Sequence, residues 1–106
     1  MTNRKILGLL GLARRAGKVA FGTEMVTGLI EKKKIKLLII ATDASERTKK
    51  NFRQIAEEKQ IPIREIENIE EISRAIGQTN KAVLGITDTN FSKEMIKSID
   101  GGDIIG

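Results

Sequence analysis

Two aspartates in the sequence closely follow apolar segments. Asp43 comes after the run at residues 37–41, and Asp88 comes after residues 82–86. In open α/β sheets, ligands and magnesium ions gather at the carboxyl ends of strands, where carboxylates serve as magnesium ligands. One hypothesis is therefore a magnesium-dependent enzyme that uses Asp43 and Asp88. The alternative is that each aspartate caps the helix after it, and this is favoured because both stand where a cap is expected.

The residue types present in the sequence exclude the other common kinds of catalytic site. The sequence has no Cys and no His, which excludes the usual zinc, haem, iron–sulfur, thiol-redox and nucleophile–His sites. Gly17-Lys18 resembles part of a phosphate loop, but Gly11 lies one residue too far upstream and Val19 replaces the Ser or Thr that would hold magnesium. We therefore predict no enzyme, no catalytic residue, no cofactor and no metal.

The turn formed by Gly22, Thr23, Glu24 and Met25 precedes a helical pattern. A helix N-terminus presents free N–H groups and the positive end of a dipole, which suits RNA phosphates and base carbonyls. The same residues also fit a plain helix capped by Thr23 with Glu24 in its first turn. Local sequence does not separate these two interpretations.

Positive charge is concentrated in one half of the chain. The formal net charge is +5, but residues 1–53 carry 13 Lys and Arg against four acids, whereas residues 54–106 carry six against ten. Any single cluster is typical of a solvated surface, but three in one half favour a polyanionic partner, with nucleic acid the leading candidate. The clusters are Arg14, Arg15 and Lys18; Lys32, Lys33, Lys34 and Lys36; and Arg47, Lys49, Lys50 and Arg53.

Stacking on bases is not expected. The only aromatic residues are Phe21, Phe52 and Phe91, and all three fall at positions assigned to the core or to a strand. RNA recognition would therefore use backbone edges and basic side chains.

The first half of the chain predicts a helix at 3–16 that ends at Gly17, a short strand at 19–21, and a helix that starts at Gly22-Thr23. Residues 37–41 are continuously apolar and branched, as in a central strand covered on both faces. Residues 43–46 resemble a capping box with Asp43 as the cap.

The second half continues the alternation of strands and helices. Pro62 predicts that the strand at 61–66 either lies at an edge or is free of pairing at that point, because proline cannot donate to a ladder. Asn68 with Glu71 predicts the start of a short helix that Gly77 ends. A polar turn at 78–81, a buried strand at 82–86, and a last helix capped by Asp88, Thr89 or Asn90 and followed by Gly101-Gly102 complete the pattern.

This alternation predicts a layered α/β fold with helices on both faces of a small sheet. A length of 106 residues with 40% hydrophobic residues suits one domain, 1–106. The longest apolar run, 37–41, is far below the roughly 20 residues that cross a bilayer. Arg14-Arg15 also interrupts the only candidate for a signal peptide. We therefore expect a cytoplasmic protein without membrane contact.

The ordered set of motifs resembles the kink-turn RNA-binding ribosomal-protein superfamily, of the L-seven-Ae and L-thirty-e type, and in particular its small bacterial YlxQ-like members. The resemblance covers almost the whole chain. It rests on the pattern Leu9-x-x-Leu12-x-x-Arg15-x-Gly17-Lys18-x-x-x-Gly22 and on the segments 37–45, 61–63, 72–77 and 83–86.

The resemblance implies a three-layer α-β-α sandwich around a mixed four-stranded sheet, and binding to kink-turns or other structured RNA of the translation apparatus without catalysis. In the archaeal branch, the RNA-contacting helix start reads Gly-x-Asn-Glu with a later Lys. Those positions fall on Gly22, Thr23, Glu24, Met25 and Gly28, of which only the glycine at 22 matches. The family's second contact, an apolar loop, falls here on the polar Gln78, Thr79, Asn80 and Lys81.

We therefore predict a non-enzymatic RNA-binding module, with possible ribosome association. The alternative is a ribosome-associated or protein-interaction domain of the same fold that has lost kink-turn recognition. The candidate RNA-binding residues are Lys18, Gly22, Thr23, Glu24, Met25, Lys32, Lys33, Lys34, Lys36, Gln78, Thr79, Asn80 and Lys81.

Overall fold

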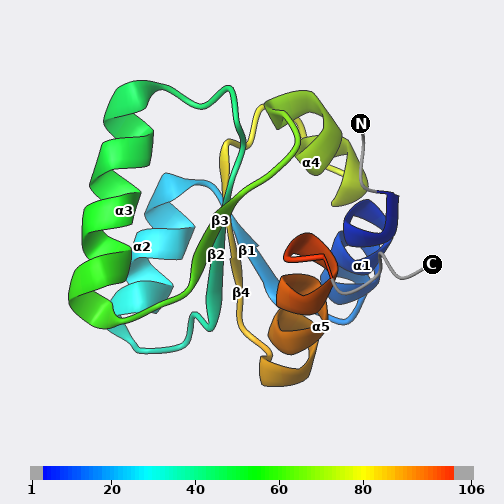
Figure 1. Ribbon diagram of the computed structural model, residues 1–106, viewed down its shortest axis with the longest axis horizontal. Coiled ribbons are helices and arrows are strands. Elements are labelled where there is room, and N and C mark those ends of the chain that lie inside the picture. Colours follow the sequence, from blue (N-terminus) through cyan, green and yellow to red (C-terminus); the bar gives the residue numbers. More distant parts are fainter. Residues whose placement is uncertain (1–3, 102–106) are drawn as a thin grey trace.

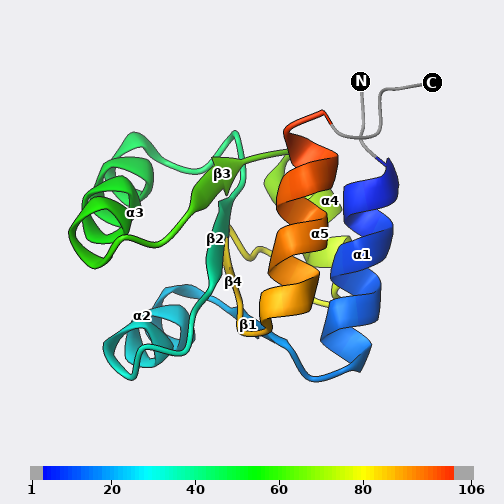
Figure 2. The same ribbon diagram turned by 60° about the horizontal axis from the view of Figure 1, so that its bottom comes forward.

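The computed structural model describes residues 4–101 as three layers, with a sheet between two groups of helices (Figure 1). Helices α2 and α3 cover one face of the sheet, and α1, α4 and α5 cover the other (Figure 2). The predicted α-β-α sandwich is confirmed. In chain order the elements are α1 (Arg4–Arg15), β1 (Val19–Phe21), α2 (Thr23–Glu31), β2 (Leu37–Ile40), α3 (Glu46–Lys59), β3 (Ile63–Glu65), α4 (Ile69–Ala75), β4 (Val83–Ile86) and α5 (Thr89–Ile99).

The sheet is mixed, with the strand order β1-β4-β2-β3. Strand β2 runs antiparallel to β4 and parallel to β3, and β1 runs antiparallel to β4. All four residues of β2 are buried, as its branched apolar sequence predicts for a central strand. The predicted edge position of the Pro62 strand is also confirmed, since β3 is outermost and the Pro62 carbonyl accepts a bond from the Leu38 N–H at 2.9 Å.

Alternate side chains of β2 build two cores, because successive residues of a strand point to opposite faces. Leu37 and Ile39 pack with the α1, α4 and α5 layer, where Ile6 and Leu10 are fully buried. Leu38 and Ile40 pack on the other face with Val26, Ile30 and Phe52 of the α2 and α3 layer. The helices are therefore held on both sides of one short apolar strand.

Two of the predicted helix caps are confirmed. Asn68 Oδ1 accepts a bond from the Glu71 N–H at the start of α4. Asp88 Oδ2 accepts a bond from the Phe91 N–H at the start of α5. Residues 3 and 102, which the sequence assigned to the first helix and to the end of the last one, lie outside the described residues.

The other two predicted caps are wrong. Ser45, not Asp43, caps α3 and accepts a bond from the Thr48 N–H, because Ala44 first closes a turn on the Ala41 carbonyl and delays the helix. In α2, Thr23 is already helical and Gly22 occupies the cap position. Gly22 has φ 88°, a conformation that favours glycine over threonine.

Within residues 4–101, no helix combines the length and the apolar character needed to span a membrane.

Candidate functional site

The predicted site residues lie at two opposite ends of the strands. At one end, the Gly22 N–H bonds to the Val83 carbonyl at 3.0 Å, next to loop 78–81. We call this end the loop edge; it contains residues 22–25, 41–48 and 78–81 and lies at the top of Figure 1. At the other end, the Thr87 N–H bonds to the Lys18 carbonyl at 2.9 Å, and the Lys36 N–H bonds to the Ile86 carbonyl at 2.7 Å. We call this the lysine end.

The structure therefore divides the candidate RNA-binding residues into two groups. Strands rise about 3.3 Å per residue, so the four steps from Lys18 to Gly22 separate the two ends by roughly 13 Å along β1. The loop edge receives Gly22, Thr23, Glu24, Met25, Gln78, Thr79, Asn80 and Lys81. The lysine end receives Lys18, Lys32, Lys33, Lys34 and Lys36.

The start of α2 differs from the starts of α3, α4 and α5. Helices α3, α4 and α5 each have a side-chain cap, whereas α2 has none. The first backbone bond of α2 runs from the Val26 N–H to the Gly22 carbonyl. The N–H groups of Thr23, Glu24 and Met25 precede that bond, and their side chains are exposed, Met25 by 46%. This helix start is therefore open to a ligand with acceptor atoms.

A groove of about 530 Å³ lies between α2 and α3, beside that helix start. Its floor includes the buried ring of Phe52, and its walls carry hydroxyl, amide and basic groups. These are the side-chain types that contact phosphate and sugar in nucleic-acid complexes. The polar lining residues are Thr23, Thr27, Arg47, Thr48, Lys50, Asn51 and Gln54.

Arg47 and Lys50 belong to a basic cluster recognised in the sequence, but they were not among the candidate site residues. Helical spacing was the signal that could have found them. Residues three apart share a helix face, so Arg47 and Lys50 point to one side, while Lys49 and Arg53, four apart, point to another. The structure confirms this division, because only the first pair lines the groove.

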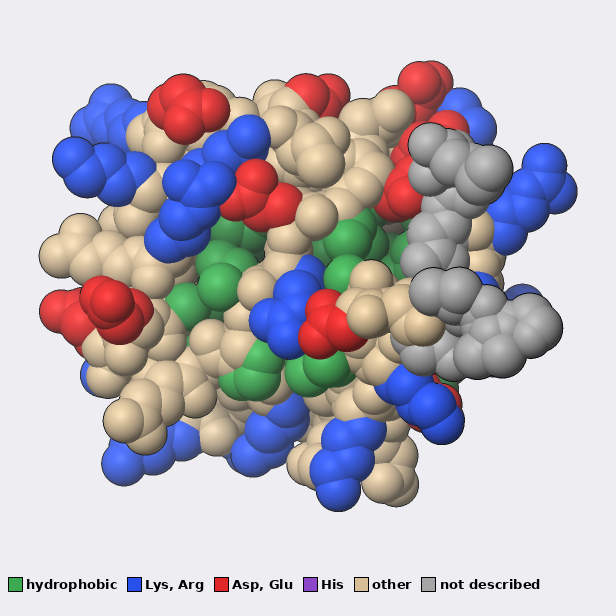
Figure 3. Space-filling view, in the orientation of Figure 1, with side chains coloured by type: hydrophobic (Ala, Val, Ile, Leu, Met, Phe, Trp, Pro, Cys, Tyr) green, Lys and Arg blue, Asp and Glu red, His purple; other side chains and the backbone are tan. Residues whose placement is uncertain are grey.

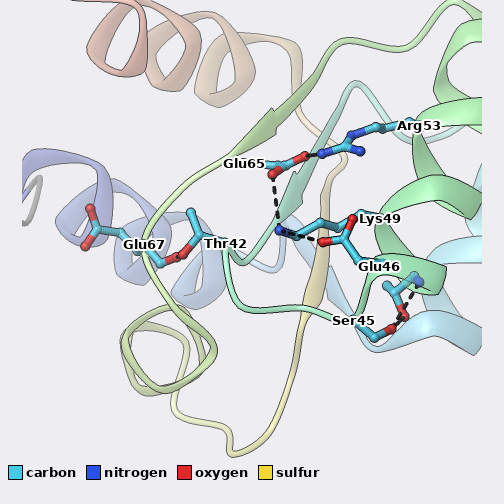
Figure 4. Close-up of polar contacts among 8 residues, drawn as sticks. Thr42, Ser45, Glu46, Lys49, Arg53, Glu65 and Glu67 are labelled. Atoms are coloured by element: carbon cyan, nitrogen blue, oxygen red, sulfur yellow. Dashed lines mark hydrogen bonds and ion pairs between the residues drawn. The ribbon is translucent and has the colours of Figure 1, made fainter.

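Lys49 and Arg53 instead form ion pairs with Glu65 of β3 (Figure 4). Lys49 Nζ lies 3.7 Å from Glu65 Oε1 and 3.8 Å from Glu46 Oε2, and Arg53 donates to the same Glu65 carboxylate. These pairs connect α3 to the edge strand. The cluster at 47–53 thus splits into two residues that support the fold and two that face the groove.

Loop 78–81 forms the other flank of the loop edge. The buried Ser73 hydroxyl accepts a bond from the Lys81 N–H at 2.8 Å and donates to the Lys81 carbonyl at 3.2 Å, which fixes the end of the loop. The loop also borders an open groove of about 570 Å³ whose lining includes Asp43 and Arg74. The loop and this groove together carry both acidic and basic side chains. The binding of a ligand here would therefore depend on hydrogen-bonding geometry as much as on net charge.

Arg14 and Lys81 approach the ring of Phe21 at the open edge of β1. The Arg14 guanidinium carbon lies 5.3 Å from the ring centroid, and Lys81 Nζ lies 5.7 Å from it. Both distances are within the range of a cation–π contact. The ring of Phe21 therefore contacts two cations at this edge of the sheet.

The magnesium hypothesis is wrong. Because β2 and β4 are antiparallel, Asp43 follows β2 at the loop edge, whereas Asp88 follows β4 at the lysine end. Asp43 is bonded to the Ile69 N–H, and Asp88 to the Phe91 N–H. Across residues 4–101, no three metal-binding side chains of the His, Cys, Asp and Glu types come together. The two carboxylates therefore cannot share one ion.

Several known proteins are similar to this chain over most of its length. The chain is 38% identical to the RNA-binding protein YlxQ of Enterococcus faecium, over 92% of this chain and 94% of that protein. It is 31% identical to the RNA-binding protein YlxQ of Bacillus subtilis, over 94% and 100%. A solved structure of a protein with unknown function from Bacillus halodurans C superposes with a TM-score of 0.87 at 35% identity, over 91% of this chain and 97% of that one.

The model of one protein family matches residues 4–96, which include every element described above except the end of α5. The chain therefore belongs to the ribosomal protein L7Ae/L30e/S12e/Gadd45 family.

Proposed function

We propose that this protein binds structured RNA through the loop edge, without catalysis. The observation that carries the proposal is the start of α2, where three exposed residues precede the first helical bond and no side chain caps the helix. Two relatives that share 38% and 31% identity with this chain are named RNA-binding proteins, which supports the same class of ligand here.

The proposed contacts divide by chemistry. A Cβ built at Gly22 would meet no protein atom within 4 Å and would point into open space. In the proposed complex RNA occupies that space, and the absence of a side chain lets its backbone approach closely. Glu24 accepts hydrogen bonds from the amino and imino groups of guanine, and the amides of Thr23 and Glu24 donate to RNA oxygens. Arg47 and Lys50 contact phosphates in the groove between α2 and α3.

A bent RNA fits this surface better than a straight one. The groove between α2 and α3 lies on one side of the α2 start, and the polar loop 78–81 lies next to it through the Gly22–Val83 backbone bond. In the proposed complex, one stem follows the groove while Gln78, Thr79, Asn80 and Lys81 contact phosphate and sugar beyond the bend. We therefore propose a kink-turn, in RNA of the translation apparatus, as the preferred ligand.

The test is a comparison of Glu24→Ala with Glu31→Ala, an exposed glutamate at the opposite end of the same helix. Calorimetry would measure binding to a kink-turn RNA and to a plain duplex of equal length. Removing the Glu24 acceptor leaves desolvated guanine donors unpaired, which costs about 1–3 kcal/mol against the kink-turn only. Glu31→Ala is expected to leave the kink-turn affinity unchanged.

Gly22→Val adds bulk and strain at the same point and is expected to abolish kink-turn binding. Circular dichroism before the titration checks that the variant is folded. If Glu24→Ala weakens both RNAs equally, or neither, the α2 start does not recognise RNA. The alternative of a protein-interaction domain, which the exposed Met25 side chain favours, would then replace this proposal.

A further inference from the structure

A second cluster of positive charge lies away from the loop edge. Three connections of the fold, those after α1, α2 and α3, bring their lysines to the lysine end. Lys33 and Lys36 line one depression together with Lys59, and they line another with Lys32, Lys34 and Thr87. In the orientation of Figure 3, blue side chains follow the lower edge of the molecule, where this end lies. We extend the lysine end to include Lys59.

These lysines are free to meet an outside partner. In the part of the chain from residue 4 to residue 101, none of Lys18, Lys32, Lys33, Lys34, Lys36 and Lys59 forms an ion pair. The nearest acids in sequence are Glu31, which ends α2, and Glu57 and Glu58, which precede Lys59. These three acids are fewer than the six lysines, and none of them forms an ion pair with a described residue. The local excess of positive charge is therefore not neutralised within the fold.

The backbone under the cluster is well anchored. The Lys33 N–H bonds to the Ile30 carbonyl and the Lys34 N–H to the Leu29 carbonyl, both at 2.9 Å, which is the Schellman pattern that closes a helix. The side chain of Ile35 is buried between the layers, and the Lys36 N–H bonds to Ile86. The loop thus presents its lysines from a defined position, which lowers the entropic cost of binding.

The chemistry of the lysine end suits phosphate better than protein. A stable protein interface needs an apolar or aromatic centre. Here Ile35 is only 5% exposed, and the apolar side chains beside it, Ile61 and Pro62, lie at one depression among Lys33, Lys36 and Lys59 without forming an aromatic centre. Lysine ammonium groups are point charges that contact phosphates without regard to sequence. An RNA backbone is therefore the partner that this end fits.

The relative position of the loop edge and the lysine end determines whether one RNA segment can bind to both. The two ends lie on opposite sides of a body of 37 × 25 × 24 Å. The two ends face in opposite directions along the strands, and nucleic-acid duplexes are stiff over lengths far greater than this, so a straight helix that lies across one end cannot also lie across the other. Building on the proposed function, we infer that the lysine end is a second, sequence-independent phosphate-binding surface, with which the protein holds two RNA segments at once.

The experiment uses the full chain with two labelled RNAs, a kink-turn hairpin and a plain duplex, and measures energy transfer between them when both are bound. The variant is Lys32→Glu/Lys34→Glu, which leaves the left-handed Lys33 backbone untouched. The matched control is Arg4→Glu/Lys97→Glu, which makes the same change in net charge at an exposed residue at the start of α1 and another near the end of α5.

We expect energy transfer in the unmodified protein and in the control, and its loss in the Lys32/Lys34 variant, with kink-turn affinity within about twofold of normal. The salt slope of duplex binding should fall by about two, one unit per reversed lysine. If the variant keeps the energy transfer, or loses kink-turn and duplex binding equally, the inference is wrong. If an acidic peptide binds this end and the duplex does not, it is also wrong.

Glu24→Ala separates this inference from the proposed function. That variant is expected to weaken the kink-turn and to leave duplex binding at the lysine end unchanged. If the kink-turn does not bind at all, duplex binding with its dependence on Lys32 and Lys34 still tests the lysine end on its own.

Discussion

Asp43 Oδ1 accepts a hydrogen bond of 2.8 Å from the backbone N–H of Ile69. A carboxylate at the end of β2 therefore holds the start of α4 instead of capping the helix that follows it. Nearby, the Thr42 N–H and hydroxyl both bond to the Glu67 carbonyl. Two segments distant in sequence are thus joined beside the groove at loop 78–81.

Asp43→Ala should lower the free energy of unfolding by about 0.5–2 kcal/mol, because it removes an acceptor and a negative charge from a helix N-terminus. Urea denaturation followed by circular dichroism measures the change. Asp43→Asn keeps an acceptor oxygen and is expected to recover most of the loss. An alanine variant as stable as the unmodified protein would contradict this role for Asp43.

Gly85 lies in β4 directly against Ile35. A Cβ at residue 85 would approach Ile35 Cδ1 to 2.6 Å, which is too close for any real contact. Ile35 Cδ1 is the end of a flexible side chain that can shift, so Gly85→Ala should destabilise the fold by about 1 kcal/mol, at the low end of the overpacking range. In Gly85→Ala/Ile35→Val the colliding methyl is absent, so the double variant should be more stable than the sum of the two single changes. Simple additivity in urea denaturation would show that no such contact exists.

Arg64 and Asp100 form a two-bond ion pair, with Arg64 Nε and a terminal nitrogen each 2.9 Å from a carboxylate oxygen. These bonds to Arg64 hold the pKa of Asp100 below its ordinary value. A folded-state pKa that is lowered adds stability at neutral pH, and that stability is lost as the pH falls through the folded pKa.

Arg64→Gln should return the pKa of Asp100 toward its ordinary value and reduce the loss of stability below about pH 4. Carboxyl NMR titration and urea midpoints across this range would measure both effects. Arg74→Gln breaks the pairs with Glu70 and Glu71 and is the control, since it should not change the Asp100 titration.

Lys33 has φ 59° at the position after the α2 C-cap, where glycine is preferred. Lys33→Gly should relieve this strain and raise the free energy of unfolding by about 0.5–1 kcal/mol. Lys34 does not have a positive φ, so Lys34→Gly removes the same charge without that gain. If both variants shift the urea midpoint equally, the strain at Lys33 is not the cause.

Local patterns predicted much of this fold because their causes are local. The branched run at 37–41 can only be a covered strand, and Pro62 can only lie where no donor is needed. Asn68 and Asp88 cap the helices next to them. In these cases, neighbouring residues carry enough information to fix the structure.

The predictions from local sequence were wrong where contacts between distant segments determine the structure. Asp43 is a suitable cap for the next helix, but Ile69, far along the chain, takes its carboxylate. By contrast, the turn at 22–25 and the lysines at 32–36 stand before and after α2, and that helix alone places them at opposite ends of the sheet. The direction of β4 relative to β2 separates Asp43 from Asp88, and sequence periodicity does not report strand direction.

The strand order also sets when the loop edge can form during synthesis. Strand β1 joins the sheet through β4, which is made long after it, whereas β2 and β3 are closer in sequence and can pair earlier. Until residues 83–86 leave the ribosome, Gly22 has no Val83 carbonyl to bond, and the start of α2 has no fixed place. The loop edge, the surface proposed to bind RNA, therefore cannot form before the last strand is made.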